Sequence, residues 1–341
     1  MHATAAIAIT VPTGPTCALS PFQQRLVLSA FPRGAAIADA RYTREGQDIR
    51  PVWVRVVLPD GALHALILRL DRWPEGVARE ARLLPLLAQA GLPVAHVLAG
   101  PVTDPDAPHL GAMAVYSVLE GTNLLQHIYR ASTEEKPRLA TLLLEAIDRL
   151  QESTPRVRAL LAREGLTDLL PRKGLAYEFR TAIAASTAGG TGSTVGTRRT
   201  MSALRRVTSE RIIERATAVL GPLVEQVEEP LCFWNGDYNP ANFLSDGHRL
   251  TGFVDFAHAA WHDPHYGLAR FTVYDWVHLD RPQLFARYCA RHQVSERDFA
   301  LRSAVHCLWL LNPTSNGDPV SDAYRARILR QLETDLDLLS T

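Results

Sequence analysis

The sequence predicts an α+β protein with two lobes, a small antiparallel sheet first and a larger, mainly helical part after it. Alternating apolar runs between Ala40 and Leu70 indicate strands, and leucines at helical spacing take over from Asn123. The chain has 341 residues, which is enough for two lobes that each bury a substantial core.

The composition is that of an ordinary globular protein, with 47% apolar and 21% charged residues. The 36 basic and 36 acidic residues cancel, so charge gives no reason to expect a nucleic-acid or anionic-membrane partner. No apolar run reaches the length of a membrane span. The four cysteines form no Cys-x-x-Cys pair, which favours free thiols and a cytoplasmic location.

Residues 1–20 are expected to form a flexible N-terminal tail. The segment lacks a positively charged start and is interrupted by Pro12 and Pro15, which argues against a signal peptide.

The first lobe is predicted to begin with a helix over Phe22–Phe31. Alternating stretches follow within Ala40–Leu58, and a turn at Pro59-Asp60-Gly61 leads to a strand over His64–Leu70. This pattern indicates a hairpin in a sheet that can cover a nucleotide. Glycine is sparse between the first strands, and Gly46 is the candidate for a phosphate loop there.

A helix is predicted over Gly76–Ala90, where Glu80 and three leucines recur at helical spacing. Pro85 lies inside this pattern and is expected to kink or break the helix. A further strand is predicted over Ala112–Leu119.

The remainder is predicted to be mostly helical. Thr187–Thr200, rich in Gly, Ser and Thr, contains no Walker-type phosphate loop and is expected to be a flexible loop or a mobile lid, with Arg198 and Arg199 able to meet phosphates. The predicted helices are Leu124–Ala131, Pro137–Glu152, Arg156–Arg163, Ser202–Leu220, Tyr266–Ala290, Ser295–Leu311 and Ser321–Leu339.

The most informative stretch is 233–256, FWNGDYNPANFLSDGHRLTGFVDF. Short apolar strands are predicted at Leu231–Trp234, Phe243-Leu244 and Thr251–Phe256, with a hairpin turn at Asp246-Gly247. Such a hairpin can bring three polar residues to one mouth, namely Asp237, Asn242 and Asp255.

These residue types suit phosphoryl transfer, which needs Mg²⁺ on the nucleotide phosphates and a group that positions the attacking hydroxyl. Asn242 and Asp255 offer the hard oxygen ligands that Mg²⁺ prefers, and Asp237 fits the catalytic base. The alternative is a turn-rich hairpin whose polar residues only cap turns.

The stretch resembles the motif of the aminoglycoside phosphotransferase and choline kinase superfamily, whose fold is bilobal and protein-kinase-like. The usual motif is His-Gly-Asp-x-x-x-x-Asn, a strand ending Asp-Phe/Trp, and Gly-Asp-Pro-x-x-Asp-Leu-Ala. This chain has Asn235-Gly236-Asp237 through Asn242, then Val254-Asp255-Phe256, then Asp263-Pro264-His265-Tyr266-Gly267-Leu268-Ala269. Asn235 and Gly267 replace the usual His and second Asp, two residues that mainly support the loop in the family.

The resemblance implies a nucleotide-binding lobe over 21–120 and a catalytic, substrate-binding lobe over 121–341. It also implies a basic residue on the third strand that holds the phosphates and pairs with a helix Glu. The only lysines are Lys136 and Lys173, so Arg69 takes this role with Glu80 as its partner. The alternatives are a solvated arginine and an exposed helix charge.

In the family, the backbone that links the lobes contacts the purine. The matching positions are Tyr116, Ser117, Val118 and Leu119, and the choice between ATP and GTP stays open. An ordinary core strand and turn is the alternative.

His258 and Trp261 follow Asp255 and are expected to line the substrate entrance, while Asp263 is a weaker substrate candidate that is expected to brace its loop. The cluster of His258, His262 and His265 also permits another reading, a zinc-dependent hydrolase, although downstream zinc-ligand spacing is missing.

The resemblance implies transfer of the γ-phosphoryl group of ATP or GTP, with Mg²⁺, to a hydroxyl of a small molecule. The acceptor that the family resemblance implies most often is an antibiotic, and phosphorylation of it would confer resistance. The acidic residues of the helical part are spread out along the sequence, which disfavours a strongly cationic acceptor. The alternatives are a kinase of choline, homoserine or a sugar, and an inactive nucleotide-binding regulatory module. A monomer or homodimer is expected.

Overall fold

The structure is a computed structural model that describes residues 14–43, 51–187, 203–227, 230–274, 278–311 and 322–341. The chain forms two compact units. Unit 1 takes in the chain up to Gln126, Ser153–Leu169 and Asn239–Ala259. Unit 2 takes in His127–Glu152, Leu170–Tyr238 and Ala260–Thr341. Segments distant in sequence therefore build each unit, and the central stretch is divided between them after Tyr238.

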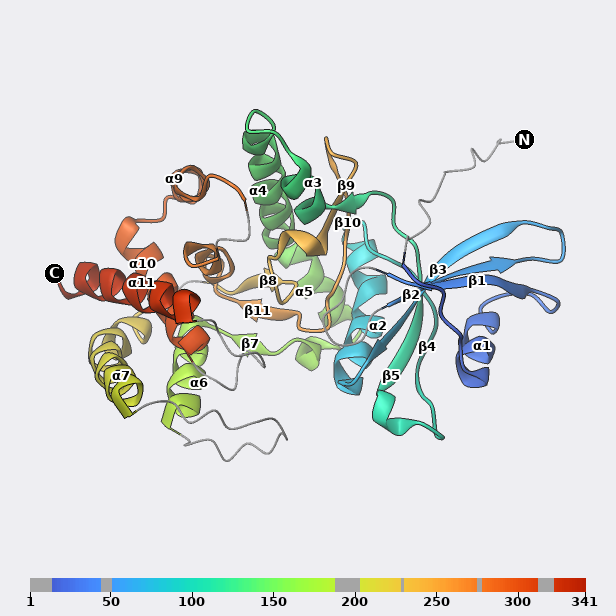
Figure 1. The fold of residues 1–341 in the computed structure, drawn as a ribbon, viewed down its shortest axis with the longest axis horizontal. Helices are drawn as coiled ribbons and strands as arrows, with labels where there is room; N and C mark the ends of the chain where they lie inside the picture. The colour runs from blue at the N-terminus through green and yellow to red at the C-terminus, as the bar shows by residue number, and fades with distance from the viewer. Residues whose placement is uncertain (1–13, 44–50, 188–202, 228–229, 275–277, 312–321) are drawn as a thin grey trace. The chain divides into compact units, whose positions relative to one another are not determined.

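Unit 1 contains a five-stranded antiparallel sheet in the order β1-β2-β3-β5-β4 (Figure 1). The strands alternate inward and outward side chains, and the predicted hairpin around Pro59-Asp60-Gly61 joins β2 to β3. The strand bounds are β1 Ala36–Tyr42, β2 Val52–Val57, β3 Leu63–Asp71, β4 Val97–Thr103 and β5 Ala112–Ser117.

Helices cover both faces of this sheet (Figure 1). α1 (Pro21–Leu28) packs on one face, where its Leu26 and Val27 join the even-numbered β3 residues Leu66 and Leu68 in one core. α2 (Pro74–Gln89) faces the odd-numbered residues, Arg69 among them. Since β3 alternates with period two, a single strand supplies the core of one face and a polar group to the other.

A second, three-stranded sheet in unit 1 has the order β10-β9-β6. The predicted turn at Asp246-Gly247 connects β9 to β10, and the Asp246 carboxylate accepts the backbone N–H groups of His248 and Arg249 at 2.8 and 2.9 Å. Other unit 1 elements are α5 and the 3₁₀ turns η1, η2 and η3. The bounds are β6 Thr122–Asn123, β9 Phe243–Ser245, β10 Leu250–Phe253, α5 Thr154–Arg163, η1 Pro108–Leu110, η2 Thr167–Leu169 and η3 Pro240–Asn242.

Unit 2 is mainly helical, with a small sheet in the order β7-β11-β8. α10 is its most buried helix and packs against α6, α7 and α11. The bounds are α4 Lys136–Glu152, β7 Arg172–Lys173, α6 Leu175–Thr187, α7 Ala203–Val224, β8 Cys232–Trp234, β11 Ala260–His262, α8 Tyr266–Ala269, η4 Arg270–Thr272, α9 Arg281–His292, α10 Glu296–Leu311 and α11 Asp322–Ser340; α3, Leu124–Arg130, crosses from unit 1 to unit 2.

Most predicted elements are confirmed within a few residues, two predictions are wrong, and one helix was missed. α2 runs unbroken past Pro85, because the proline is exposed while leucines on either side of it are buried. The single helix predicted over Tyr266–Ala290 is divided, since Asp280 caps a new helix with Pro282 in its first turn. The helix α6 was not predicted at all.

No helix within the described ranges is both long and apolar enough to cross a membrane.

Candidate active site

Arg69 of β3 forms an ion-pair network inside unit 1. Its Nη1 donates to both carboxylate oxygens of Glu80 at 3.1 and 2.9 Å, and its Nη2 donates to Asp255 Oδ1 at 2.8 Å. Nη2 also lies 3.3 Å from Asp71 Oδ2. The predicted pair of Arg69 with Glu80 is confirmed, and Glu80, only 3% exposed, is not a solvated helix charge.

Glu80 connects three segments of unit 1. Besides Arg69, it accepts the backbone N–H of Phe256 at 2.9 Å and the hydroxyl of Tyr116 at 3.3 Å. Burial raises the pKa of the Glu80 carboxyl, against the opposing effect of Arg69. Burial opposes the charged form of Arg69 too, but the carboxylates of Glu80 and Asp255 hold its pKa above the ordinary value. The network thus fixes the backbone just after Asp255.

Asp255 follows β10 with a left-handed backbone conformation, φ 65°. Such a conformation is uncommon for a residue other than glycine and costs about 1 kcal/mol or more, which the surrounding contacts must offset. Asn242 is the last residue of η3, directly before β9, and its carbonyl accepts the N–H of Val254 at 3.0 Å. Asn239 and Asp246 are the residues whose side chains cap turns in this stretch. Turn capping therefore does not account for Asp255.

The oxygens of Asn242 and Asp255 fit a hard divalent cation. Mg²⁺ is held by one or two protein oxygens together with phosphates and water, and the Asp255 side chain is 41% exposed. The zinc alternative is not supported, because the described residues contain no group of three or more His, Cys, Asp or Glu suited to a metal. His262 is fully buried and bonded to Glu178 at 3.1 Å.

Asp237 lies in unit 2, on the loop that follows β8. The fully buried Asn235 holds this loop, since its amide donates to the Asp237 carbonyl at 2.9 Å and its side-chain oxygen accepts the Asp237 N–H at 3.3 Å. The Asp237 carboxylate forms an ion pair with Arg270 of η4. Asn235 therefore supplies loop support at the position of the family's usual His.

Gly267 is required by its neighbour Tyr238. A Cβ at position 267 would meet Tyr238 Cδ2 at 2.4 Å and Cε2 at 2.6 Å, and would lie 3.1 Å from Trp234 Nε1. Tyr238 is 1% exposed and packs edge-on against Trp234. The aromatic ring thus fills the space beside the loop and leaves no room for the family's usual Asp.

The predicted linker strand is two residues too long. β5 ends at Ser117, and Tyr116 and Ser117 are already engaged between β3 and β4, with the Ser117 N–H bonded to the His96 carbonyl at 2.9 Å. Val118 and Leu119 are the first residues beyond the ladder. A backbone contact with a purine is consequently a prediction for Val118 and Leu119 rather than for Tyr116.

The three weaker substrate candidates differ in placement. His258 in unit 1 is exposed and stacks on Trp73 at 4.7 Å between ring centroids. Trp261 is a buried β11 residue, 5% exposed, that packs edge-on against Phe233, so the structure does not support a place at a substrate entrance. Asp263, 3% exposed, pairs with Arg302 at 3.0 Å and accepts two backbone N–H groups, which is a bracing arrangement.

Two residues of these networks were missed by sequence reasoning. Arg270 comes directly after the Leu268-Ala269 end of the motif, and Asp71 follows Arg69 by two positions on the same face of β3. The strand alternation predicted for β3 was a usable signal for Asp71. Three candidates lie outside the described residues, namely Gly46, Arg198 and Arg199. The proposed loop or lid over Thr187–Thr200 also lies outside them, except for Thr187.

The chain belongs to the phosphotransferase enzyme family, whose sequence model matches residues 41–303. No curated protein matches the chain. Its fold is similar to that of the aminoglycoside phosphotransferase APH(4)-Ia in a thermostable mutant form, with 18% identity, TM-score 0.60 and coverage of 92% of this chain and 98% of that one.

Two further solved structures share the fold. APH(2")-IIia in complex with GDP and kanamycin has 18% identity, TM-score 0.56 and coverage of 92% and 97%. An ethanolamine kinase of Plasmodium vivax has 11% identity, TM-score 0.51 and coverage of 88% and 81%. These similarities establish the kinase-like α+β fold that the sequence predicted.

Proposed function

We propose that this phosphotransferase moves the γ-phosphoryl group of a nucleoside triphosphate, in the presence of Mg²⁺, to a hydroxyl of a small molecule. The observation that carries the proposal is the network of Arg69, Glu80 and Asp255 in a chain that also retains Asp237 and Asn242 at the family spacing. In the transfer, a bond forms between the acceptor oxygen and the γ-phosphorus. The bond from that phosphorus to the bridging oxygen breaks, and the nucleoside diphosphate leaves.

Each residue has a proposed role. Asp237 positions the acceptor hydroxyl and takes its proton, a role that its half-exposed carboxylate permits. Arg69 steadies the phosphates, with Glu80 orienting its guanidinium. Asn242 and Asp255 would hold Mg²⁺, which neutralises charge on the phosphates when bound.

The charge around Arg69 supports a cation at this place. One guanidinium faces the three carboxylates of Asp71, Glu80 and Asp255, which leaves two formal negative charges in excess when all are ionised. A divalent cation at Asp255 offsets that excess. Bound phosphates alone would increase it, so nucleotide binding is expected to depend on the metal.

The acceptor is proposed to be a hydroxylated antibiotic, with a metabolite such as a choline-type or sugar alcohol as the second candidate. Similarity to two aminoglycoside kinases favours the first, and similarity to an ethanolamine kinase favours the second.

The test is nucleotide consumption with Mg²⁺ against a panel of hydroxylated antibiotics and metabolites, with each product weighed by mass spectrometry. We expect one compound to gain one phosphate with ATP or GTP. Asp237→Asn should reduce this transfer by about 10²-fold or more. A matched control is Asp246→Asn, which alters only an exposed turn of the same stretch and should retain activity.

The inactive-module alternative makes the opposite prediction. A module would bind the magnesium nucleotide and consume none of it with any compound, and full activity in Asp237→Asn would show that the base is assigned to the wrong residue. Asn235 and Gly267, which motivated that alternative, each have a supporting role in the loop that holds Asp237.

A further inference from the structure

The ion pair of Asp237 with Arg270 bears on the chemical class of the acceptor, an inference that rests on the proposed function. Arg270 opens η4 directly after α8, and its Nη1 contacts Asp237 Oδ1. The side chain is 16% exposed, and its guanidinium lies 4.9 Å from the centre of the Tyr274 ring. A positive charge therefore stands beside the proposed base, held by an aromatic face and a carboxylate.

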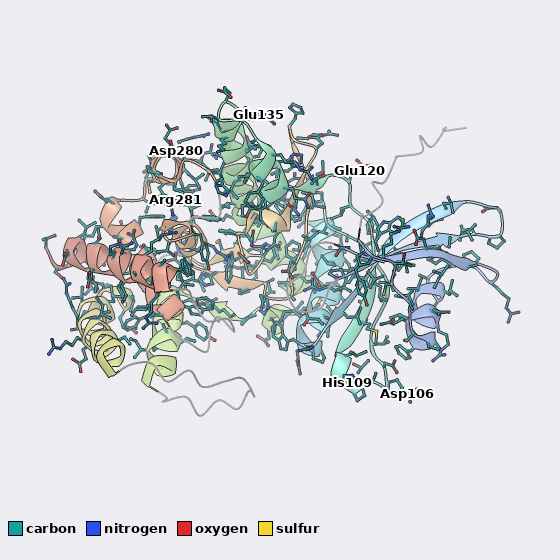
Figure 2. The ribbon with its side chains drawn as sticks, in the orientation of Figure 1. Asp106, His109, Glu120, Glu135, Asp280 and Arg281 are labelled. Atoms are coloured by element: carbon teal, nitrogen blue, oxygen red, sulfur yellow. The ribbon has the colours of Figure 1, made fainter. Side chains whose placement is uncertain are left out.

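Two more arginines bind the backbone that carries Arg270. Arg281 Nη1 donates to the carbonyls of Phe271, Thr272 and Tyr274 at 3.4, 3.2 and 3.1 Å. Arg327 Nη1 donates to the Val273 carbonyl at 3.4 Å. Figure 2 labels Arg281 next to Asp280, the residue that caps α9. The segment from Arg270 to Tyr274 is thus fixed by cations and carries positive charge.

The carboxylates bonded around this part of unit 2 are already paired with cationic or neutral partners. Asp263 pairs with Arg302 at 3.0 Å, with both side chains 1% exposed. Glu178 bonds to His262, and Asp148 contacts both Arg291 and His292. Asp275 lies outside the described residues. Within the described part of unit 2, these carboxylates do not form the open acidic cluster that a polycationic ligand needs.

We propose that the acceptor is neutral or anionic around its reacting hydroxyl, and that Arg270 is the positioning residue which orients Asp237 and disfavours polycationic amino sugars. Arg270 neutralises the Asp237 carboxylate, so this place lacks the free negative charge that would attract an ammonium group of the acceptor, and a neutral or anionic acceptor meets no uncompensated carboxylate there.

The experiment compares three panels of hydroxylated compounds at equal ionic strength: polycationic aminoglycosides, neutral glycosides and nucleosides, and anionic hydroxy acids and sugar phosphates. Calorimetry measures binding to the protein loaded with Mg²⁺ and a non-hydrolysable nucleotide, and product mass measures transfer. The wild type should bind and modify members of the neutral or anionic panels. Arg270→Gln should raise the affinity for cationic relative to neutral compounds by roughly tenfold.

Arg270→Lys keeps the charge and should keep the wild-type preference, whereas a merely structural role would make the Lys and Gln variants alike. Arg215→Gln, which removes an exposed arginine of α7, is the matched control and should change no preference. Preferential binding of aminoglycosides by the wild type, or no binding of any neutral or anionic compound, overturns the inference. Loss of magnesium-nucleotide binding itself would instead overturn the proposed function.

Discussion

Arg69 illustrates how a single side chain ties the two sheets of unit 1 to one helix. It lies on β3, bonds Glu80 on α2, and reaches Asp255 beyond β10. A lysine would present one point charge, whereas the planar guanidinium donates to Glu80 and Asp255 from different nitrogens at the same time. The arginine is therefore matched to this arrangement rather than a neutral exchange for lysine.

Removing that guanidinium should destabilise the fold. Arg69→Met leaves the buried Glu80 without its cation, and we expect the free energy of unfolding to fall by about 3 kcal/mol in urea titrations. Arg69→Lys should lower the free energy of unfolding by less, because a positive charge remains beside Glu80. Arg41→Met, which breaks a pair with Asp39 whose two side chains are 36% and 13% exposed, should cost about 1 kcal/mol. Equal stability of Arg69→Met and wild type would refute the network's structural role.

The absence of a side chain at Gly267 is equally specific. Gly267→Ala places a methyl group within 2.6 Å of two Tyr238 ring carbons, so we expect a loss of roughly 1–3 kcal/mol and a displaced Asp237 loop. The unfolding temperature and kcat should both decrease. Gly174→Ala meets only Leu231 Cδ2 at 3.5 Å and serves as the control. If both variants behave alike, the close packing of Tyr238 does not constrain the loop.

At the scale of elements, the strands and most helices followed from periodicity, but two kinds of feature did not. Pro85 breaks the local rule for helices, and only the burial of the leucines around it, a tertiary effect, lets α2 continue. α6 carries a weak apolar pattern that becomes a buried face only when α7 and α10 pack on it. Local sequence contains neither of these contacts.

In the candidate site, too, some features could be predicted from the sequence and others could not. Spacing identified Asp237, Asn242 and Asp255 as candidates. The pairing of Arg69 with Glu80 followed from the family resemblance, and periodicity only placed the two residues on a strand and a helix. The pair of Asp237 with Arg270 spans 33 positions with no regular period between them, so no pattern could reveal it. Trp261 was expected to line the substrate entrance, whereas pairing of β11 with β8 buries it, and this pairing joins segments that local sequence does not connect.

The packing of α11 on α10 includes a buried acid with a pH effect that can be measured. Burial raises the pKa of Asp335 to about 6, partly offset by hydrogen bonds from Ser303 and Gln331. Its pKa in the unfolded chain is near 3.8, so between about pH 4 and pH 6 the folded state binds more protons than the unfolded state. Stability from this group is therefore present below pH 4 and lost as pH rises to 6.

Asp335→Asn removes this titration. At pH 8 the variant should be more stable than the wild type by up to about 2 kcal/mol, and its stability should decline less between pH 4 and 6. Urea unfolding at pH 4, 6 and 8 measures both effects. Asp337→Asn on the same helix, where the side chain is 73% exposed, should leave the pH dependence unchanged. An unaltered slope in Asp335→Asn would place the titration elsewhere.

At the scale of the whole molecule, each unit is assembled from segments that are distant in sequence, and the motif stretch contributes to both. Asp237 belongs to unit 2, and Asn242 and Asp255 belong to unit 1. A nucleotide and cation bound at Arg69, Asn242 and Asp255 would stabilise the folded state of unit 1, to which all three residues belong.

Magnesium nucleotide should accordingly raise the temperature at which unit 1 unfolds. At a hundred times the dissociation constant, binding to the folded state adds about 2.7 kcal/mol. Asp255→Asn isolates the metal's contribution, because asparagine tolerates the left-handed backbone at this position and removes only the charge. We expect this variant to fold but to lose most of the magnesium-dependent shift seen by thermal unfolding with ADP.

The control for that experiment is nucleotide without metal, which separates the phosphate contacts from the cation. Because two negative charges are in excess around Arg69, metal-free nucleotide should shift the wild type only slightly, and Asp255→Asn, with one charge fewer, should tolerate it at least as well. The two proteins would thus respond in opposite order with and without Mg²⁺. An equal magnesium-dependent shift in both would mean that Asp255 does not bind the metal, whatever role its contact with Arg69 plays in folding.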